Sequence, residues 1–425
     1  MFKRFFYSEA TSISKKSYLW NIIAGCVNAA EAVILMSVVA RVVNDEAAGI
    51  LTIAFAVGNL LMNVGKFGVR NFQVTDTDNF SFSDYFSLRI ITTTAMVLFS
   101  VLFVAFKCLF GNYDAEKAIS VLSICLIYCL ESFEDVYLGH YQSKGRLDVA
   151  SKVFIVRWLG IIVFFIGSVL ISKVMSLSII VAFMVSIILE LVLIRDANSV
   201  INIGKYKVSF SLVRKIAVNC LPLFAFAFLT FYITNAPKYA IDNVLSNSDQ
   251  AVFGILAMPV FLIELLNNFM YQPQLVDLSK EWNSRDYKSF SLRMMKQFVC
   301  ILILTLICSG CSYVFGNRLL TIIFSVNVDD YRTELLVLML AGGMMAIMGY
   351  TSVIITVMRK QIFMLIGMVT VSLLALFGFE YFVKSLGLLG AAKYRLLLFS
   401  IAAIYNCVCI VIFMNIQKRN KKKTI

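Results

Sequence analysis

The sequence predicts an all-α polytopic membrane protein with about twelve transmembrane helices in two six-helix bundles, and with both termini in the cytoplasm. Hydrophobic residues make up 60% of the 425 positions, and charged residues only 15%. Ordinary soluble domains carry about 25% charged residues. The apolar residues also fall into runs of about 20, the length that crosses a bilayer. These observations exclude a soluble enzyme.

The apolar runs form two sets of six. The first set lies near 19–43, 47–65, 86–107, 117–138, 153–172 and 174–194. The second set lies near 216–236, 250–271, 298–316, 334–357, 361–383 and 392–416. The first run is too long for the apolar core of a cleaved signal peptide, so it is interpreted as a retained helix. We therefore expect an N-terminal bundle over 1–195, a cytoplasmic linker over 196–215, and a C-terminal bundle with a basic tail over 216–425.

The lysines and arginines indicate the orientation. With the N-terminus inside and alternating spans, 28 of the 38 Lys and Arg residues fall on the cytoplasmic side. This is the positive-inside bias of membrane proteins. It explains the net charge of +13 without a nucleic-acid partner. The tail ending in Lys-Lys-Lys-Thr-Ile is expected to face anionic membrane lipid.

The two sets of spans show a weak internal repeat. Because each set begins inside, the repeat must be parallel, related by an axis along the membrane normal. A shift of 205 residues superimposes three pairs: Gly49 on Gly254, Asn59 on Glu264 and Asn63 on Asn268. All four prolines lie in the first hairpin of the second set, where they predict either a hinge or a static kink. They are Pro222, Pro237, Pro259 and Pro273.

Polar side chains within the spans are the candidate functional residues, because polar groups in hydrocarbon need a partner or a water-filled cavity. At 100° per residue along a helix, the polar side chains of the second span share one face. The corresponding span of the second bundle carries a similar row of polar side chains, and we call each row a polar stripe. The stripes can line a central cavity, or they can hold the bundle together by interhelical hydrogen bonds. The residues are Asn28, Glu31, Asn59, Asn63, Lys66, Arg70, Glu264 and Asn268. Lys66 and Arg70 can also be positive-inside anchors.

Carboxylates within the spans suggest ion coupling. Glu31 and Glu264 are candidates for coupling to protons or sodium, since a carboxylate at that depth requires a partner or a proton. The cluster of Glu131, Glu134 and Asp135 is instead expected to form an ion network with Arg157 or Lys152. The single histidine, His140, excludes multi-histidine metal sites. We expect no metal, no cofactor and no catalytic residue.

Several segments resemble the polysaccharide-biosynthesis flippases of the multidrug/oligosaccharidyl-lipid/polysaccharide exporter superfamily. The segment 40–49, Ala-Arg-Val-Val-Asn-Asp-Glu-Ala-Ala-Gly, is similar to the family's acidic turn and glycine between helices 1 and 2. The segment 65–70, Gly-Lys-Phe-Gly-Val-Arg, resembles its glycine-bearing helix exit. Further similar segments are Gln142 with Gly145-Arg146, and 238–242 followed by 252–254.

The resemblance implies a function. It implies two bundles in a V around a central cavity that alternates between the leaflets of the cell inner membrane. Its substrate would be a polyprenyl-pyrophosphate-linked oligosaccharide, moved from the cytoplasmic to the outer leaflet for assembly of O-antigen lipopolysaccharide or capsule. Lys66, Arg70 and Arg41 would attract the diphosphate. A polysaccharide polymerase and a chain-length regulator are candidate partners.

Physical chemistry explains why such a substrate needs a protein, and two other functions remain open. Burying one unpaired hydroxyl in hydrocarbon costs about 4–8 kcal/mol, so an oligosaccharide does not cross unaided. The first alternative is a multidrug or cation antiporter of the same superfamily, which would use Glu31 or Glu264. The second is a membrane polysaccharide polymerase or glycosyltransferase. The short predicted outer loops argue against an enzyme.

Overall fold

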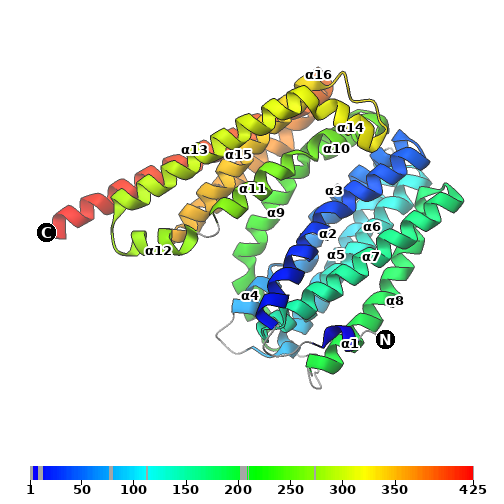
Figure 1. Ribbon diagram of the computed structural model, residues 1–425, viewed down its shortest axis with the longest axis horizontal. Helices are drawn as coiled ribbons and strands as arrows, with labels where there is room; N and C mark the ends of the chain where they lie inside the picture. Colours follow the sequence, from blue (N-terminus) through cyan, green and yellow to red (C-terminus); the bar gives the residue numbers. More distant parts are fainter. Residues whose placement is uncertain are drawn as a thin grey trace. The chain divides into compact units, whose positions relative to one another are not determined.

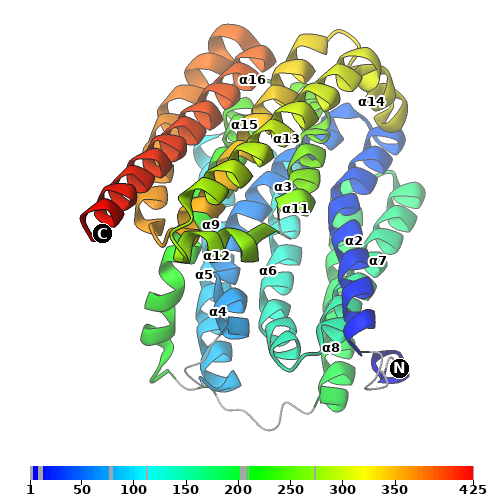
Figure 2. The ribbon, with the colours of Figure 1, turned by 60° about the vertical axis from the view of Figure 1, so that its left-hand side comes forward.

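The computed structural model describes residues 3–7, 13–75, 80–111, 113–201, 208, 210–271 and 274–424. The regular structure of these residues is helical throughout. The chain folds as two compact units, Met1–Phe231 and Tyr232–Ile425. Figures 1 and 2 show the helices in sequence colours.

The first unit consists of long helices with short ones at their ends. Its helices are α1 (Lys3–Phe6), α2 (Ile13–Val42), α3 (Asp45–Lys66), α4 (Val69–Thr75), α5 (Phe82–Phe110), α6 (Ala115–Ser143), α7 (Leu147–Ser172), α8 (Met175–Ile201) and the first part of α9 (Val213–Val244). Within it, α6 packs against α3, α5, α7 and α8. It therefore links four of the other long helices of the unit.

The second unit begins within α9. Its other helices are α10 (Asn247–Ala257), α11 (Val260–Tyr271), α12 (Leu275–Asn283), α13 (Tyr287–Cys311), the π-helical turn η3 (Ser312–Gly316), α14 (Asn317–Phe324), α15 (Arg332–Val357) and α16 (Gln361–Thr424). Helix α15 packs against α11, α13 and α16. Pro259 lies in the break between α10 and α11, as expected of a residue that cannot donate a backbone hydrogen bond.

The helices confirm the predicted fold class. Ten helices of the described chain are long and apolar enough to cross a membrane. The last of them, Gln361–Gln417, comprises two helices, because Gly387 has a non-helical backbone with φ 59°. Helix α6 also has the length of a span, although it carries Glu131, Glu134 and Asp135. Counting α6, and counting the two parts of α16 separately, gives twelve in the described ranges. The cytoplasmic position of the termini and the bundle boundaries at 195 and 216 stay predictions.

Side-chain caps define where several helices begin. Asn44 accepts a hydrogen bond through Oδ1 from the Ala47 amide at 2.8 Å and so caps α3. Ser81 and Asp84 form a reciprocal capping box at the start of α5, and Ser246 and Asp249 form another at the start of α10. Each cap satisfies backbone N–H groups that the first helical turn leaves without partners.

Replacing Asn44 with alanine tests the cap of α3. The first-turn amide of Ala47 would lose its acceptor, and we expect a loss of about 1 kcal/mol in the free energy of unfolding. Equilibrium unfolding of the purified protein in mixed micelles measures the change. The matched control is Asn71→Ala, a change at an exposed asparagine within α4. An N44A protein as stable as native would show that the cap contributes nothing.

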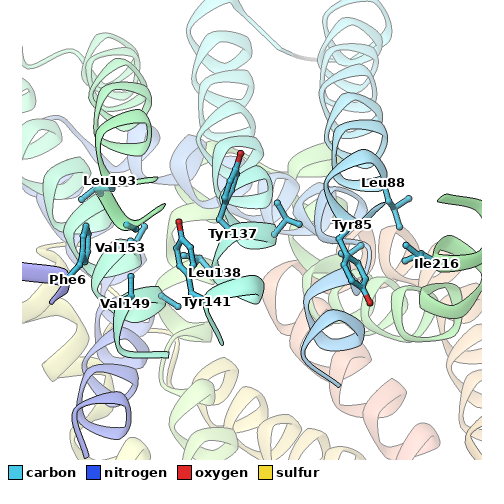
Figure 3. Packing of buried hydrophobic residues seen from close by; sticks show 14 of the residues in the cluster. Phe6, Tyr85, Leu88, Tyr137, Leu138, Tyr141, Val149, Val153, Leu193 and Ile216 are labelled. Carbon is cyan, nitrogen blue, oxygen red and sulfur yellow. The ribbon is translucent and has the colours of Figure 1, made fainter. Parts of the chain in front are cut away.

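A cluster of buried side chains secures one end of α6 (Figure 3). Tyr137, Leu138 and Tyr141 of α6 lie between residues of α7 and α8 on one side and residues of α5 and α9 on the other. All three are at most 4% exposed. The cluster therefore holds the end of α6 that follows its three carboxylates.

Candidate functional site

The polar stripe predicted on the second span lies along α3. Asn59 donates through Nδ2 to the Phe55 carbonyl at 2.9 Å, and Asn63 donates to the Asn59 carbonyl at 2.8 Å. Both side chains are partly exposed. The stripe ends at Lys66, after which Phe67 and Gly68 adopt left-handed backbone conformations with φ 45° and 68°. Arg70 follows on α4.

Lys66 belongs to a buried ion network around Glu131 of α6. The Lys66 ammonium contacts Glu131 Oε1 at 2.8 Å. Arg157 of α7 contacts Glu131 Oε2 at 3.1 Å and Glu134 Oε2 at 2.5 Å. The indole N–H of Trp158 also donates to Glu131 Oε2, at 2.9 Å. The predicted pairing of this acidic cluster with Arg157 is confirmed, and the network joins α3, α6 and α7.

Lys152, the other predicted partner of the cluster, has a different role. Its ammonium donates to the Phe5 carbonyl at 2.7 Å. The neighbouring Arg146 donates through Nη2 to the Phe6 carbonyl at 2.8 Å. Both contacts fasten the N-terminal segment to α7.

A second network centres on Asp135. Arg89 of α5 contacts Asp135 Oδ2 at 2.8 Å, and Arg70 contacts Oδ1 at 3.4 Å. Arg70 also donates to Gln142 Oε1 through Nε and Nη2, at 3.1 and 2.9 Å. Arg89 donates to the Gly65 carbonyl at 2.5 Å. Both predicted cations of this face, Lys66 and Arg70, are thus paired with carboxylates of α6.

Gly65 allows the helices of these networks to approach closely. A Cβ atom at this position would lie 2.6 Å from Ser132 Oγ on α6 and 2.7 Å from Met96 Sδ on α5. Such contacts are shorter than side chains tolerate, so only glycine fits without movement of α5 or α6. The close approach also exposes the Gly65 carbonyl to Arg89.

Glu31 lies close to the first network but is not neutralised by it. Its side chain is 5% exposed, and Tyr128 of α6 donates its hydroxyl to Oε1 at 3.3 Å. Its Oε2 has no hydrogen-bond partner among the described residues. Glu31 interacts electrostatically with Glu131, Arg157 and Lys66.

The region around Arg157 contains more acids than bases. Glu190 of α8 is 3% exposed and interacts electrostatically with Arg157 and Glu134. The buried carboxylates Glu31, Glu131, Glu134 and Glu190 therefore share two cations, Lys66 and Arg157. Buried charge without a counter-charge is costly, so the surplus favours uptake of protons or other cations at this site.

The second unit contains a smaller group of charged residues around Arg395. Arg395 of α16 is 4% exposed and interacts electrostatically with Glu264 of α11 and with Lys238 of α9. No ion pair or hydrogen bond joins Lys238 to another described residue. The guanidinium of Arg395 makes a cation–π contact with Phe399, with 5.7 Å between its Cζ and the ring centroid. Among the described residues, Arg395 thus has one opposing carboxylate, Glu264, and one repelling cation, the partly buried Lys238.

Two of the other predicted site residues lie on α2. Asn28 of α2 is exposed, and Arg41 is exposed near the end of the same helix. The side chain of Asn268 lies outside the described residues. Its neighbour Asn267 is 1% exposed and donates to the Ala346 carbonyl at 3.3 Å.

Sequence reasoning did not place Arg89, Lys238 and Arg395 inside the helical units, and it foresaw Arg157 only as a partner of the acidic cluster. It assigned Arg89 and Arg157 to the cytoplasmic side because both fall near the predicted ends of spans. It placed Lys238 and Arg395 among the residues of the opposite side. A signal was present for Arg157, which is followed by an uninterrupted apolar run to Ile166. A cation ahead of such a run requires a carboxylate partner on a neighbouring helix.

These features define the class of protein. The chain is an all-α, multi-pass membrane protein of two helical units, each with buried charged groups among its membrane-length helices. No known protein family and no curated protein matches the sequence.

Solved structures of membrane transporters share the fold. The lipid II flippase MurJ, in an inward closed conformation, superimposes with a TM-score of 0.70 and 13% identity, over 93% of this chain and 87% of that chain. An inward-facing multidrug resistance MATE family transporter of the MOP superfamily gives 0.67 and 12%, over 93% and 96%. A MOP superfamily transporter from Pyrococcus furiosus, described by the reverse polarity of its binding pocket, gives 0.58 and 13%, over 98% of each chain. The chain therefore has the MATE/MurJ-like transporter fold.

Proposed function

We propose that this protein is a flippase of the cell inner membrane that translocates a polyprenyl-pyrophosphate-linked oligosaccharide to the outer leaflet by alternating access. Its product would serve O-antigen or capsule assembly and would pass to a polysaccharide polymerase under a chain-length regulator. The fold shared with the MurJ lipid II flippase supports a lipid-linked substrate. The likeness is one of fold, so the choice of substrate rests on the charges.

The two neighbouring cations of the second unit, Lys238 and Arg395, are the observation that carries this proposal. Lys238 and Arg395 repel each other, and Glu264 opposes only the charge of Arg395, so a bound anion would relieve the repulsion. A diphosphate offers several acceptor oxygens, and its hydrogen bonds to cationic side chains are of the strong, charge-assisted kind. A cationic drug would instead be repelled by these two groups.

Predicted cations of the first unit have a supporting role in this proposal. The side chains of Lys66 and Arg70 are 31% and 30% exposed, so each can exchange its carboxylate partner for a phosphate oxygen. Arg41, exposed on α2, would attract the diphosphate from solvent. The amides of Asn28, Asn59, Asn63 and Asn268 would satisfy sugar hydroxyls.

We propose that Glu31 couples transport to an ion, a proton or sodium, with Glu264 as a second candidate. The surplus of carboxylates around Glu31 supports the first assignment, because a surplus negative charge is relieved by a bound cation. Glu264 adjoins Arg395 and is already partly compensated. The two carboxylates are thus expected to differ in their effect on coupling.

Replacing Glu31 with glutamine is expected to remove the dependence of transport on an imposed pH or sodium gradient, while substrate binding persists. Glutamine keeps the shape and the acceptor for the Tyr128 hydroxyl but cannot take up a proton. Transport into proteoliposomes, with and without each gradient, measures the effect. Glu46→Gln is the matched control, since Glu46 is exposed at the start of α3. A gradient dependence that E31Q leaves unchanged would remove Glu31 from the coupling role.

A multidrug or cation antiporter is the second candidate function. The observation that favours it is the same carboxylate surplus of the first unit, which could hold a cationic drug in place of a coupling ion. Expression in a drug-sensitive host distinguishes the two candidates. Increased resistance to cationic dyes, lost in E31Q, would support the antiporter.

Deleting the gene in its native host, followed by assay of lipid-linked oligosaccharides in each leaflet, tests the main proposal. We expect a complete repeat unit to accumulate on the cytoplasmic face and surface polysaccharide to be lost. Normal surface polysaccharide with no accumulation, in a host without a second flippase, would contradict the proposal and favour the antiporter.

A further inference from the structure

A polar cavity lies between α12 and α13 in the second unit, apart from the buried charges described above. Its volume is about 440 Å³, within the range of roughly 300–1,000 Å³ typical of small-molecule sites. Helix α12 folds back against the start of α13, where Trp282 packs on Phe290 with 5.3 Å between ring centroids. Figure 2 shows α12 beside the lower part of α13. We refer to this cavity as the α12–α13 pocket.

One wall of the pocket is held in place by a chain of amides. Gln274 donates to Gln297 Oε1 at 3.0 Å, and Gln297 donates to Asn267 Oδ1 at 3.0 Å. Asn267 in turn donates to the Ala346 carbonyl of α15. Gln297 is only 2% exposed, so this wall is fixed before any ligand arrives. Such preorganisation lowers the entropy lost on binding.

Charges of both signs line the same pocket. Arg293 is paired with Glu281, with Nη2 and Nε at 2.7 and 2.9 Å from Oε1. Glu281 Oε2 has no hydrogen-bond partner within the described part of the chain. Lys296 is exposed and forms no ion pair there either. The pocket therefore has a free ammonium and, in its wall, a buried carboxylate oxygen without a hydrogen-bond partner in the described chain, a combination that fits a ligand carrying both an anionic and a cationic group.

The apolar side of the pocket adjoins a surface suited to acyl chains. Leu292 lines the pocket and is 57% exposed. Met295, Val299 and Leu302 continue the same face of α13 and are 50–56% exposed. Their spacing of three and four residues places them on one side of the helix. In a membrane-spanning helix, such an exposed apolar side faces lipid.

We propose that the α12–α13 pocket binds the phosphoethanolamine headgroup of a membrane phospholipid, with the acyl chains along the exposed face of α13. The phosphate would contact Lys296, and the primary ammonium would donate to Glu281. A choline headgroup lacks N–H donors for Glu281, and a glycerol headgroup lacks the cation. The proposal is independent of the transported substrate, because it uses none of the residues assigned to transport.

Native mass spectrometry of the full-length, delipidated protein tests this proposal. The probes are phosphatidylethanolamine, phosphatidylcholine and phosphatidylglycerol with identical acyl chains. We expect phosphatidylethanolamine to bind at least about tenfold more tightly than the other two. Equal binding of all three lipids would overturn the proposal, and a preference for phosphatidylglycerol would identify an anionic-lipid site instead.

Variants place the binding in the pocket. Lys296→Ala and Glu281→Gln are each expected to weaken phosphatidylethanolamine binding about tenfold. Lys288→Ala, at an exposed lysine of the same helix outside the pocket, should leave it unchanged. E281Q also disturbs the ion pair with Arg293. K296A breaks no ion pair among the described residues, so it tests binding in the pocket independently of that pair. An equal loss of phosphatidylethanolamine affinity in K288A and K296A would overturn the site. Free phosphoethanolamine that binds as tightly as the lipid would overturn it as well.

Discussion

Replacing Arg157 with leucine is expected to lower the free energy of unfolding of the protein by about 3–5 kcal/mol, the cost of removing one partner from a buried ion pair. Arg157 is fully buried and contacts both Glu131 and Glu134. Leucine would leave Glu134 without its cation and would leave Glu131 with Lys66 alone. The remaining carboxylates would have to take up protons or draw in water, and both responses destabilise the packed helices.

Unfolding in mixed micelles, followed by tryptophan fluorescence, measures this loss. A Trp282→Phe background confines the signal to Trp20 and Trp158, both in the first unit. The control is Arg214→Leu, because Arg214 is an exposed arginine of α9. The triple variant R157L/E131Q/E134Q should recover much of the loss, since it removes the carboxylates together with the cation. A change below about 1 kcal/mol in R157L would mean that the ion network is solvated and contributes little.

The helices of this protein were predictable from sequence because the bilayer imposes a length. A run such as 334–357 has one stable arrangement in hydrocarbon, a helix that satisfies its own backbone, and α15 covers Arg332–Val357. The length of the apolar run at 117–138 likewise predicts α6, although this helix carries three carboxylates. It located the break between 383 and 392 only approximately, whereas the non-helical residue is Gly387.

The pairing of charges was far less predictable. Periodicity along one helix showed that Asn59, Asn63 and Lys66 share a face of α3. It could not show that Lys66 meets Glu131, since the two residues are 65 positions apart and their contact depends on how α3 and α6 pack. Only the Arg157 partnership was foreseen, because a cation near an acidic cluster in sequence is an obvious candidate partner.

The charged neighbours of Arg395 in the second unit could not be predicted from the sequence either. Lys238, Glu264 and Arg395 belong to three different helices, and nothing in the spacing of the residues brings them together. Positive-inside counting treats every lysine and arginine as a residue of a loop or a helix end. It therefore overlooks those that helix packing buries, such as Arg89 and Arg395.

Replacing Lys238 or Arg395 with alanine is expected to weaken binding of the lipid-linked diphosphate by about 10- to 100-fold and to abolish transport at low substrate concentration. This range corresponds to the loss of one charge-assisted contact of about 1.5–3 kcal/mol. Arg395→Lys should retain part of the affinity, because it keeps the charge but not the planar geometry of the guanidinium. Lys393→Ala is the matched control, since Lys393 is exposed two residues before Arg395.

Comparing two ligands separates a direct contact with the diphosphate from a general loss of structure. The native protein should bind the polyprenyl diphosphate more tightly than the corresponding monophosphate, because the second phosphate adds charge and acceptors. If Arg395 contacts the diphosphate, that preference should shrink in R395A, whereas structural damage would weaken both ligands equally. An unchanged preference in K238A and R395A would contradict the assignment. Tighter binding of cationic dyes by the same variants would then favour the antiporter, since these two cations would have been opposing a positively charged substrate.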